Sequence, residues 1–342
     1  MSSAKVMVIY TGGTFGMTQN GNNALSPSRW DDIVAHISPI NKEDFKQVEF
    51  TLESFDNPLD SSQMTPKEWV MMAEIIQKNY HSHDGFIIIH GTDTMAYSAS
   101  VLSFMFHSLS KPIIFTGAQL PVTHTRTDAS INLINAIYLA AAKVFRIPII
   151  PEVLICFNKV LLRGNRSTKK STFDFMGFES PNFPQLGRFN QKIEINKKNI
   201  LQIPEIPTKF LFNICPDIIT INLFPGMNFK FLKYINKSNE IKGIVLRSFG
   251  SGNIPQSQEF IEFLEEAIQL NIVIVNITQC KEGSIKPHQY GASLHNKNLP
   301  IINGYDSTLE AASTKLMWVL ANSSPQDHHA LMSKNLVGEI TT

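Results

Sequence analysis

The sequence predicts an α/β protein with a larger N-terminal domain, in which helices flank a mostly parallel sheet, and a smaller C-terminal α/β domain. Three observations support this prediction. Short apolar runs alternate with helical patterns, which is typical of parallel β-α units. The chain of 342 residues is longer than one typical core accommodates. The periodicity fades near residues 182–207, where three prolines lie among Lys and Asn residues.

The first half of the chain starts with an apolar strand at Val6–Tyr10, and a helix starts near Thr65. Thr65 can cap this helix, Pro66 suits its first position, and Glu68 can complete a capping box. The same patterns predict strands at Phe86–Ile89, Pro112–Phe115 and Val153–Phe157, and helices at Ala96–Leu109 and Ile131–Ala142.

A second, shorter β-α series follows the region of faded periodicity. We expect an N-terminal catalytic domain over residues 1–190, a linker over 191–213 and a C-terminal domain over 214–342. The second series predicts strands at Ile218–Leu223, Gly243–Leu246 and Ile272–Ile277, and helices at Ser257–Leu270, Ser307–Leu320 and Gln326–Lys334.

Composition narrows the class of protein. A formal net charge of +1, from 30 basic and 29 acidic side chains, argues against a nucleic-acid partner. No segment approaches the roughly 18 apolar residues of a membrane span, and the short apolar run after Lys5 does not read as an export signal. The three cysteines, Cys156, Cys215 and Cys280, are an odd number and lie far apart in the sequence, which fits reduced thiols. We therefore expect a cytoplasmic protein that binds neither nucleic acid nor membrane.

Three predicted strands of the first half end in turns rich in glycine and hydroxyl groups: Tyr10–Thr14 (YTGGT), His90–Thr94 (HGTDT) and Thr116–Gln119 (TGAQ). Ligands of open parallel sheets bind outside the carboxyl ends of the strands. One such loop alone is usually a simple turn. The first loop also lacks the spacing of a dinucleotide site or a P-loop. Three loops at successive strand ends indicate a shared crevice.

Several segments together resemble the asparaginase family. Thr11–Met17 (TGGTFGM) and Ile89–Ser100 (IHGTDTMAYSAS) are similar to its two signature segments. The resemblance extends from near residue 4 to the C-terminus and is weakest at residues 20–53 and 185–213. Four more segments follow in the family's order: Leu59–Trp69 (LDSSQMTPKEW), Gly164–Lys169 (GNRSTK), Leu246–Asn253 (LRSFGSGN) and Asn276–Cys280 (NITQC).

The resemblance implies hydrolysis of L-asparagine to L-aspartate and ammonia, without a cofactor or metal ion. It implies that Thr14 is the nucleophile and forms an acyl-enzyme. A threonine hydroxyl attacks only where neighbouring groups activate it. Thr92, Asp93 and Lys169 match the family's Thr-Asp-Lys arrangement. Asp93 would favour the charged ammonium of Lys169. We therefore assign Lys169 the polarisation and orientation of Thr92.

The substrate is a zwitterion, so its ammonium needs an anion and its carboxylate needs hydrogen-bond donors. Asp60 and Asp93 are the candidate anions, and Ser61 and Ser62 are candidate donors in the family's substrate loop. The resemblance also implies a homodimer or homotetramer, in which Asn253 reaches the site of a neighbouring subunit.

The sequence departs from the family pattern in the loop after the nucleophile segment. Many relatives carry a tyrosine there that helps to complete the site, whereas Gly21–Pro27 contains none. Tyr290 matches a tyrosine of part of the family, and we expect its hydroxyl to contact Thr14.

The type I branch, which lacks an export signal, includes members with a second, activating asparagine site. Residues of this chain that match its lining are Thr168, Arg247, Thr278, Gln279 and Cys280. An arginine suits an effector carboxylate through a bidentate pair. The simpler interpretation of Cys280 is a small packed side chain.

Other interpretations stay open at this point. The substrate could be glutamine or the amide of a charged tRNA, although the chain shows no basic face for RNA. A non-catalytic amino-acid sensor would be expected to lack the nucleophile or part of the Thr-Asp-Lys set. Simpler structural roles fit Thr11 as a turn hydrogen-bond donor and Asp128 as a loop or capping carboxylate. Arg163 and Arg166 would be solvated or lie at an oligomer interface.

Overall fold

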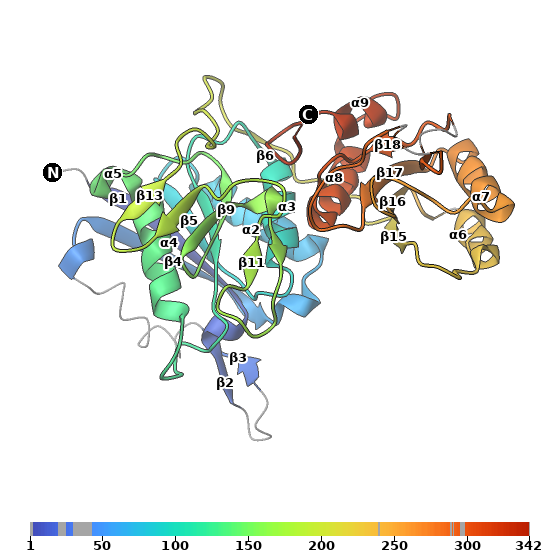
Figure 1. Cartoon of the computed structure of the whole chain (residues 1–342). Coiled ribbons are helices and arrows are strands. Elements are labelled where there is room, and N and C mark those ends of the chain that lie inside the picture. Colours follow the sequence, from blue (N-terminus) through green and yellow to red (C-terminus); the bar gives the residue numbers. More distant parts are fainter. Residues whose placement is uncertain are drawn as a thin grey trace. The chain divides into compact units, whose positions relative to one another are not determined.

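A computed structural model describes residues 3–19, 25–29, 43–238, 240–287, 289, 291–294 and 298–341. The chain divides into two compact units, Met1–Leu211 and Phe212–Thr342, drawn from blue to yellow and from yellow to red in Figure 1. The boundary predicted from the sequence, with a linker over residues 191–213, stays a prediction.

The first unit contains an eight-stranded sheet in the order β13-β12-β9-β8-β7-β5-β1-β4. The five neighbouring strands from β4 to β8 pair in parallel, and the pairs β8-β9, β9-β12 and β12-β13 are antiparallel. The mostly parallel sheet is therefore confirmed. Its strands are β1 (Ala4–Gly12), β4 (Val48–Leu59), β5 (Gly85–Ile89), β7 (Ile113–Thr116), β8 (Val153–Phe157), β9 (Val160–Arg163), β12 (Gly187–Phe189) and β13 (Ile193–Ile195).

Helices flank this sheet (Figure 1). The side chains of β5, β7 and β8 are all buried, as expected for parallel strands covered on both faces. Val8 of β1 and Leu133 of one helix share a core cluster. Another helix starts with the predicted capping box of Thr65 and Glu68. The helices of this unit are α2 (Pro66–Asn79), α3 (Met95–Met105), α4 (Ala129–Ala140) and α5 (Ala142–Phe145).

Short elements fill the connections of the first unit. The predicted helix Ala96–Leu109 ends early, at Met105, because Phe106 and His107 pair with Phe210 and Lys209. The short elements are β2 (Met17–Gln19), β3 (Leu25–Pro27), β6 (Phe106–His107), β10 (Thr168–Lys169), β11 (Phe178–Glu179), β14 (Lys209–Phe210), and the 3-10 helices η1 (Thr14–Gly16), η3 (Glu43–Phe45), η4 (Ser61–Gln63) and η5 (Gly164–Arg166).

The second unit has its own parallel sheet and core. Its strands are β15 (Ile218–Asn222), β16 (Gly243–Ser248), β17 (Val273–Thr278) and β18 (Ile302–Asn303), and its helices are η6 (Phe229–Phe231), α6 (Lys233–Lys237), α7 (Gln258–Gln269), α8 (Leu309–Asn322) and α9 (His328–Ser333). A buried ion pair joins Lys315 of α8 to Glu339 at 2.6 Å. Glu339 also accepts hydrogen bonds from the backbone of Leu336 and Val337, so this pair fastens the C-terminal segment to α8.

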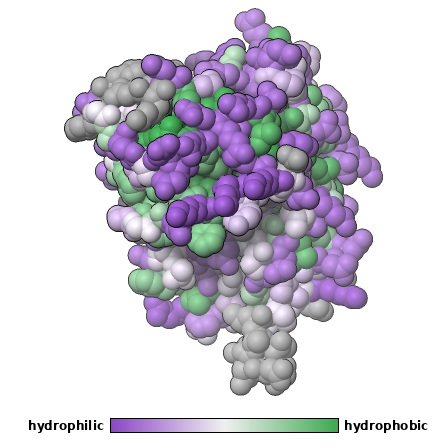
Figure 2. Space-filling view, turned by 90° about the vertical axis from the view of Figure 1, so that its right-hand side faces the viewer, coloured by the Kyte–Doolittle hydropathy of each residue, from purple (hydrophilic) through white to green (hydrophobic). Residues whose placement is uncertain are grey.

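Figure 2 shows one face of the molecule, on which hydrophobic side chains lie among hydrophilic ones. Phe224 and Phe231 of the second unit are 54% and 67% exposed, whereas Phe229 and Phe249 pack against its core. No helix in the described part of the chain is both long and apolar enough to cross a membrane.

Candidate active site

Two of the three predicted loops meet the segment after β4 through backbone contacts that only glycine permits. Gly13 has φ of +80°, and a Cβ placed on it would lie 2.3 Å from the Cα of Gly91. A Cβ on Gly91 would lie 2.6 Å from the Oγ of Ser61. The loops after β1 and β5 and the start of η4 are thus in direct contact, because two of them lack side chains at the meeting point.

The β1-β4 pairing explains why residues 60 and 61 lie beside the loop after β1. The register shifts between Tyr10 and Gly12, so that Gly12 pairs with Leu59. Gly13 then donates its backbone N–H to the carbonyl of Leu59 at 2.8 Å. Asp60 caps η4 by accepting a hydrogen bond from the backbone N–H of Ser62. The chain therefore presents Asp60 and Ser61 next to Thr14.

A polar cavity of about 150 Å³ lies among these loops. It contains three hydroxyls, two carboxylates and an ammonium group from residues that the sequence analysis selected. Ser62 is not among its lining residues. The lining consists of Gly13, Thr14, Met17, Asp60, Ser61, Gly91, Thr92, Asp93, Gln119, Lys169 and Thr172.

Lys169 connects the two polar side chains of the loop after β5. Its Nζ lies 2.8 Å from Oγ1 of Thr92 and 2.6 Å from Oδ1 of Asp93. The side chain of Lys169 is 17% exposed and that of Asp93 is 60% exposed. Solvent therefore screens the ion pair on the Asp93 side, and the pair contributes little to stability. Its geometry instead holds the ammonium group against the hydroxyl of Thr92.

A buried chain of hydrogen bonds fixes the backbone just before Thr92. Nε1 of Trp69 donates to Oγ of Ser98 at 2.9 Å, and that Oγ lies 2.9 Å from Nε2 of His90. Because Ser98 accepts from Trp69, its own proton can go to His90, and Nδ1–H of His90 then donates to the carbonyl of Gly91 at 2.7 Å. Burial lowers the pKa of His90 to about 4, against a smaller opposing effect of the Gly91 hydrogen bond, so the ring is neutral.

Gln119 and Thr172 line the cavity although the sequence analysis did not select them as site residues. The third predicted loop supplies Gln119, and its backbone N–H donates to the carboxylate of Asp128, which confirms a loop role for that aspartate. The side-chain amide of Gln119 donates to the carbonyl of Asp174 at 2.8 Å. The turn after β10 carries Thr172, and no local pattern in the sequence marks it as part of a site.

Arg163 and Arg166, which lie just before Lys169 in the sequence, were expected to be solvated or to lie at an oligomer interface. Arg163 is 4% exposed and pairs with Glu152, and Arg166 is 1% exposed and donates to the carbonyl of Asn182. The expectation of solvated or interfacial guanidinium groups is therefore wrong. Thr11 donates to the carbonyl of Ile89, as predicted for a turn-stabilising hydroxyl.

The remaining predicted residues lie elsewhere. Asn253, Thr278 and Cys280 line a separate cavity of about 380 Å³ in the second unit. The side-chain amide of Gln279 donates hydrogen bonds to the carbonyls of Leu223 and Arg247. Thr168 belongs to the first unit, on β10. Tyr290 lies outside the described residues.

Family models match nearly the whole chain. The model for "Asparaginase, N-terminal" matches residues 5–201, and the model for "Glutaminase/Asparaginase C-terminal domain" matches residues 217–332. The chain belongs to the asparaginase family. It is therefore a hydrolase that acts on amides.

Individual members of the asparaginase family are similar over their full lengths. L-asparaginase 1 of Escherichia coli is 38% identical over 347 aligned positions, which cover 100% of this chain and 99% of the relative. The crystal structure of L-asparaginase I from Vibrio cholerae matches with a TM-score of 0.88 and 36% identity, with 100% of both chains covered. The thermostable L-asparaginase of Thermococcus kodakarensis matches with a TM-score of 0.88 and 28% identity over 99% of each chain.

Among the residues with described positions, no group of three or more His, Cys, Asp or Glu side chains is placed to hold a metal ion.

Proposed function

We propose that this asparaginase hydrolyses L-asparagine to L-aspartate and ammonia through an acyl-enzyme on Thr14. The observation that carries the proposal is the contact of the Lys169 ammonium with both Thr92 and Asp93 in the same small cavity that Thr14 lines. A hydroxyl nucleophile needs such a polarised setting, because an isolated threonine is a weak nucleophile.

In the first step, Oγ1 of Thr14 attacks the carbon of the substrate's side-chain amide. A C–O bond forms, and the C–N bond breaks as the nitrogen takes up a proton and leaves as ammonia. The carbonyl oxygen gains negative charge during this step, and backbone N–H groups of the Thr14 and Thr92 turns are its proposed donors. The product is an ester between Thr14 and the aspartyl group.

In the second step, water attacks the ester carbon, the C–O bond to Thr14 breaks, and a proton of the water passes to Oγ1 of Thr14 as L-aspartate leaves. Thr92 accepts a hydrogen bond from Lys169, so its own proton is available to orient the attacking water. Asp93 keeps the ammonium group of Lys169 in place at 2.6 Å. Lys169 therefore acts on the water through Thr92 in this scheme.

The charged ends of the substrate need partners at the rim of the cavity. We propose that Asp60 and Asp93 bind the α-ammonium group and that Ser61 and Ser62 bind the α-carboxylate. Ser61 already accepts a hydrogen bond from the backbone N–H of Asp93 at 3.2 Å, so the substrate loop and the Thr92 loop form one unit. We retain Tyr290 as the proposed phenol next to Thr14.

Steady-state release of ammonia across a range of asparagine concentrations tests the function. We expect Thr14→Ala to lower kcat by at least ~10³-fold, as loss of a catalytic nucleophile does. The control is Thr11→Ser, which keeps the hydroxyl that bonds to Ile89 and should retain kcat within about threefold. Full activity in Thr14→Ala would exclude the proposed nucleophile, and asparagine binding without ammonia release would favour a sensor.

Glutamine is the main competing substrate. It is one methylene longer than asparagine, and pockets discriminate one methylene by about 1–3 kcal/mol. We therefore expect a measurable glutaminase side activity, with kcat/KM about 10- to 200-fold below that for asparagine. Equal values for both amides would contradict asparagine as the preferred substrate.

We further propose activation by a second asparagine molecule, assembly as a homodimer or homotetramer, and a cytoplasmic location. Thr278 and Cys280 share a cavity in the second unit, which supports part of the predicted effector site. The exposed Phe224 and Phe231 support assembly. The three cysteines carry free thiols, which fits a reducing compartment. A sigmoidal rate curve that becomes hyperbolic in Cys280→Ala would support activation.

A further inference from the structure

The strand that carries Lys169 lies outside the main sheet of the first unit. β10 contains only Thr168 and Lys169 and pairs with β11 in a two-stranded ribbon. A ribbon of this length is not stable by itself. The position of the Lys169 ammonium group must therefore be set by the chain that leads from the main sheet to β10, which is the end of β9 and the 3-10 helix η5.

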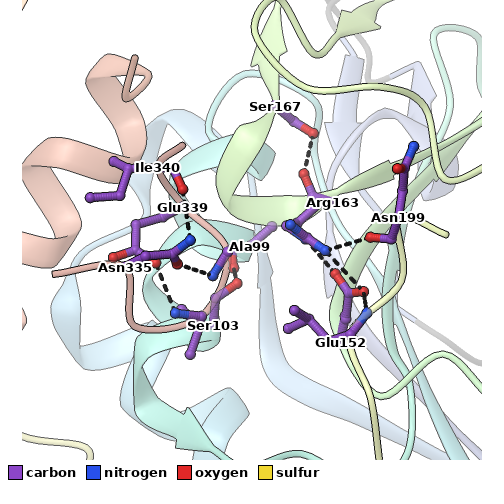
Figure 3. A network of polar contacts seen from close by, with 12 residues as sticks. Ala99, Ser103, Glu152, Arg163, Ser167, Asn199, Asn335, Glu339 and Ile340 are labelled. Carbon is purple, nitrogen blue, oxygen red and sulfur yellow. Dashed lines mark hydrogen bonds and ion pairs between the residues drawn. The ribbon is translucent and has the colours of Figure 1, made fainter. Parts of the chain in front are cut away.

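A buried ion pair holds the start of that connection. Nε and Nη2 of Arg163, the last residue of β9, donate to the two carboxylate oxygens of Glu152 at 2.5 and 3.2 Å. Nη2 also donates to the carbonyl of Asn199 (Figure 3). The backbone N–H of Leu201 donates to Glu152. The side chains of both charged residues are less than 5% exposed, at 4% and 2%. A guanidinium group that donates to a carboxylate in this forked geometry has a fixed orientation.

A hydrogen bond to the main chain of Arg163 connects this residue to the far end of η5. Oγ of the buried Ser167 donates to the carbonyl of Arg163 at 2.7 Å, which closes the turn around η5 (Figure 3). The guanidinium groups of Arg163 and Arg166 lie 4.3 and 5.1 Å from the ring centre of Phe183. The turn that leads to Lys169 is therefore held at both ends.

The same turn packs closely on the helix that follows the Thr92 loop. A Cβ on Gly164 would lie 2.9 Å from Cβ of Ala99 on α3 and 3.0 Å from the carbonyl of Val153. The helix α3 begins at Met95, directly after Thr92, Asp93 and Thr94. The Gly164 contact thus sets the distance between the element that carries Thr92 and the one that carries Lys169.

We propose that Arg163 and Glu152 are positioning residues for catalysis, which hold Lys169 at hydrogen-bonding distance from Thr92. The proposal rests on the proposed function, because it assumes that the contact of Lys169 with Thr92 is used in turnover. A buried ion pair is weak as a stabilising device, since the cost of removing both charges from water offsets most of their attraction. Its geometric specificity is the property that an apolar pair of similar volume lacks.

The test is a double variant, Arg163→Met with Glu152→Met, which removes both charges and leaves no unpaired one. Such replacements are often neutral for stability. We expect kcat for asparagine to fall ~10- to 100-fold, since a misplacement of about 1 Å can cost about 100-fold. KM should stay within about threefold, because the pair touches no substrate. The single variant Arg163→Lys keeps the charge without the fork and should lose less kcat than the double variant.

The matched control is the other buried ion pair, Lys315 with Glu339, which fastens the C-terminal segment in the second unit. Lys315→Met with Glu339→Met should keep kcat within about twofold, even if the melting temperature falls. Folded Arg163 and Glu152 variants with unchanged kcat would overturn the proposal, as would an equal loss of kcat in the control pair.

Lys169→Met separates this proposal from the proposed function. Loss of activity in Lys169→Met together with normal kcat in the Arg163 and Glu152 variants would refute only the positioning role. Full activity in Lys169→Met would refute the proposed use of Lys169 in turnover, and with it the positioning role, but it would leave hydrolysis through Thr14 standing.

Discussion

At the scale of single residues, His90 is a group beside the candidate site whose ionisation is set by its surroundings. His90 is completely buried and neutral, and its two ring nitrogens have fixed roles between Ser98 and Gly91. It touches none of the proposed reacting groups. Its place directly before Gly91 and Thr92 makes it a support for the backbone of that loop.

We predict that His90 makes stability fall at acidic pH. In the unfolded chain a histidine binds a proton near pH 6.5, whereas burial lowers the pKa of His90 to about 4 in the native state. The unfolded state therefore binds more protons between these values, and stability falls as pH decreases through that window. Relative to His90→Gln, the free energy of unfolding should drop by on the order of 3 kcal/mol from pH 7 to pH 4.

Denaturant unfolding at several pH values measures this difference. The comparison is between the unchanged protein and His90→Gln at each pH. Parallel curves for the two proteins would contradict the buried neutral state of His90.

At the scale of elements, the site is assembled by loops that meet at glycine. Gly13 and Gly226 both have positive φ, +80° and +83°, but a Cβ on Gly226 would meet nothing within 4 Å. Substitutions at these two glycines therefore distinguish the cost of backbone strain, which both share, from the cost of a close contact, which only Gly13 has.

We predict that Gly226→Ala costs only about 1–2 kcal/mol of stability, from its left-handed backbone, and leaves activity unchanged. Gly13→Ala carries the same strain and a contact of 2.3 Å with the Cα of Gly91, so the loops must move apart. It should cost several kcal/mol more and lower kcat at least ~100-fold. Unfolding free energies and ammonia release check both values, and similar effects of the two substitutions would contradict the close contact.

The elements that the sequence predicts well are those with a strong local pattern. The buried strand at Phe86–Ile89 and the capped helix at Thr65 are confirmed. β4 was not predicted, because Val48–Leu59 mixes exposed, charged and apolar residues along its length. The ribbon of β10 and β11 was also missed, since residues remote from it determine its shape. At the site, the repeated loops at strand ends predicted the crevice. Thr172 could not be predicted, because only the folded chain brings it to the lining of the cavity.

At the scale of the whole molecule, the two units have separate sheets and separate apolar cores. Family models also match them separately, over residues 5–201 and 217–332. In the proposed dimer or tetramer, side chains that are exposed in a single chain become buried between subunits.

We predict that light scattering gives a mass of two or four times the chain mass of 38.4 kDa. Phe224→Ser with Phe231→Ser should lower this mass, because two exposed rings are lost, each able to contribute about 1.5–3 kcal/mol when buried. Ile131→Ser, at an exposed position on α4 of the first unit, is the comparison. A monomeric mass for the unchanged protein would contradict the proposed assembly.

The distribution of thiols has a practical consequence. Cys156 and Cys215 are buried, and Cys280 is exposed. A maleimide dye added to the native protein should therefore react at one position per chain, without engineered cysteines. Because Cys280 lines the same cavity as Asn253, such a dye reports on that cavity directly. Protection of Cys280 from the dye by asparagine would therefore test the proposed effector site without a measurement of turnover.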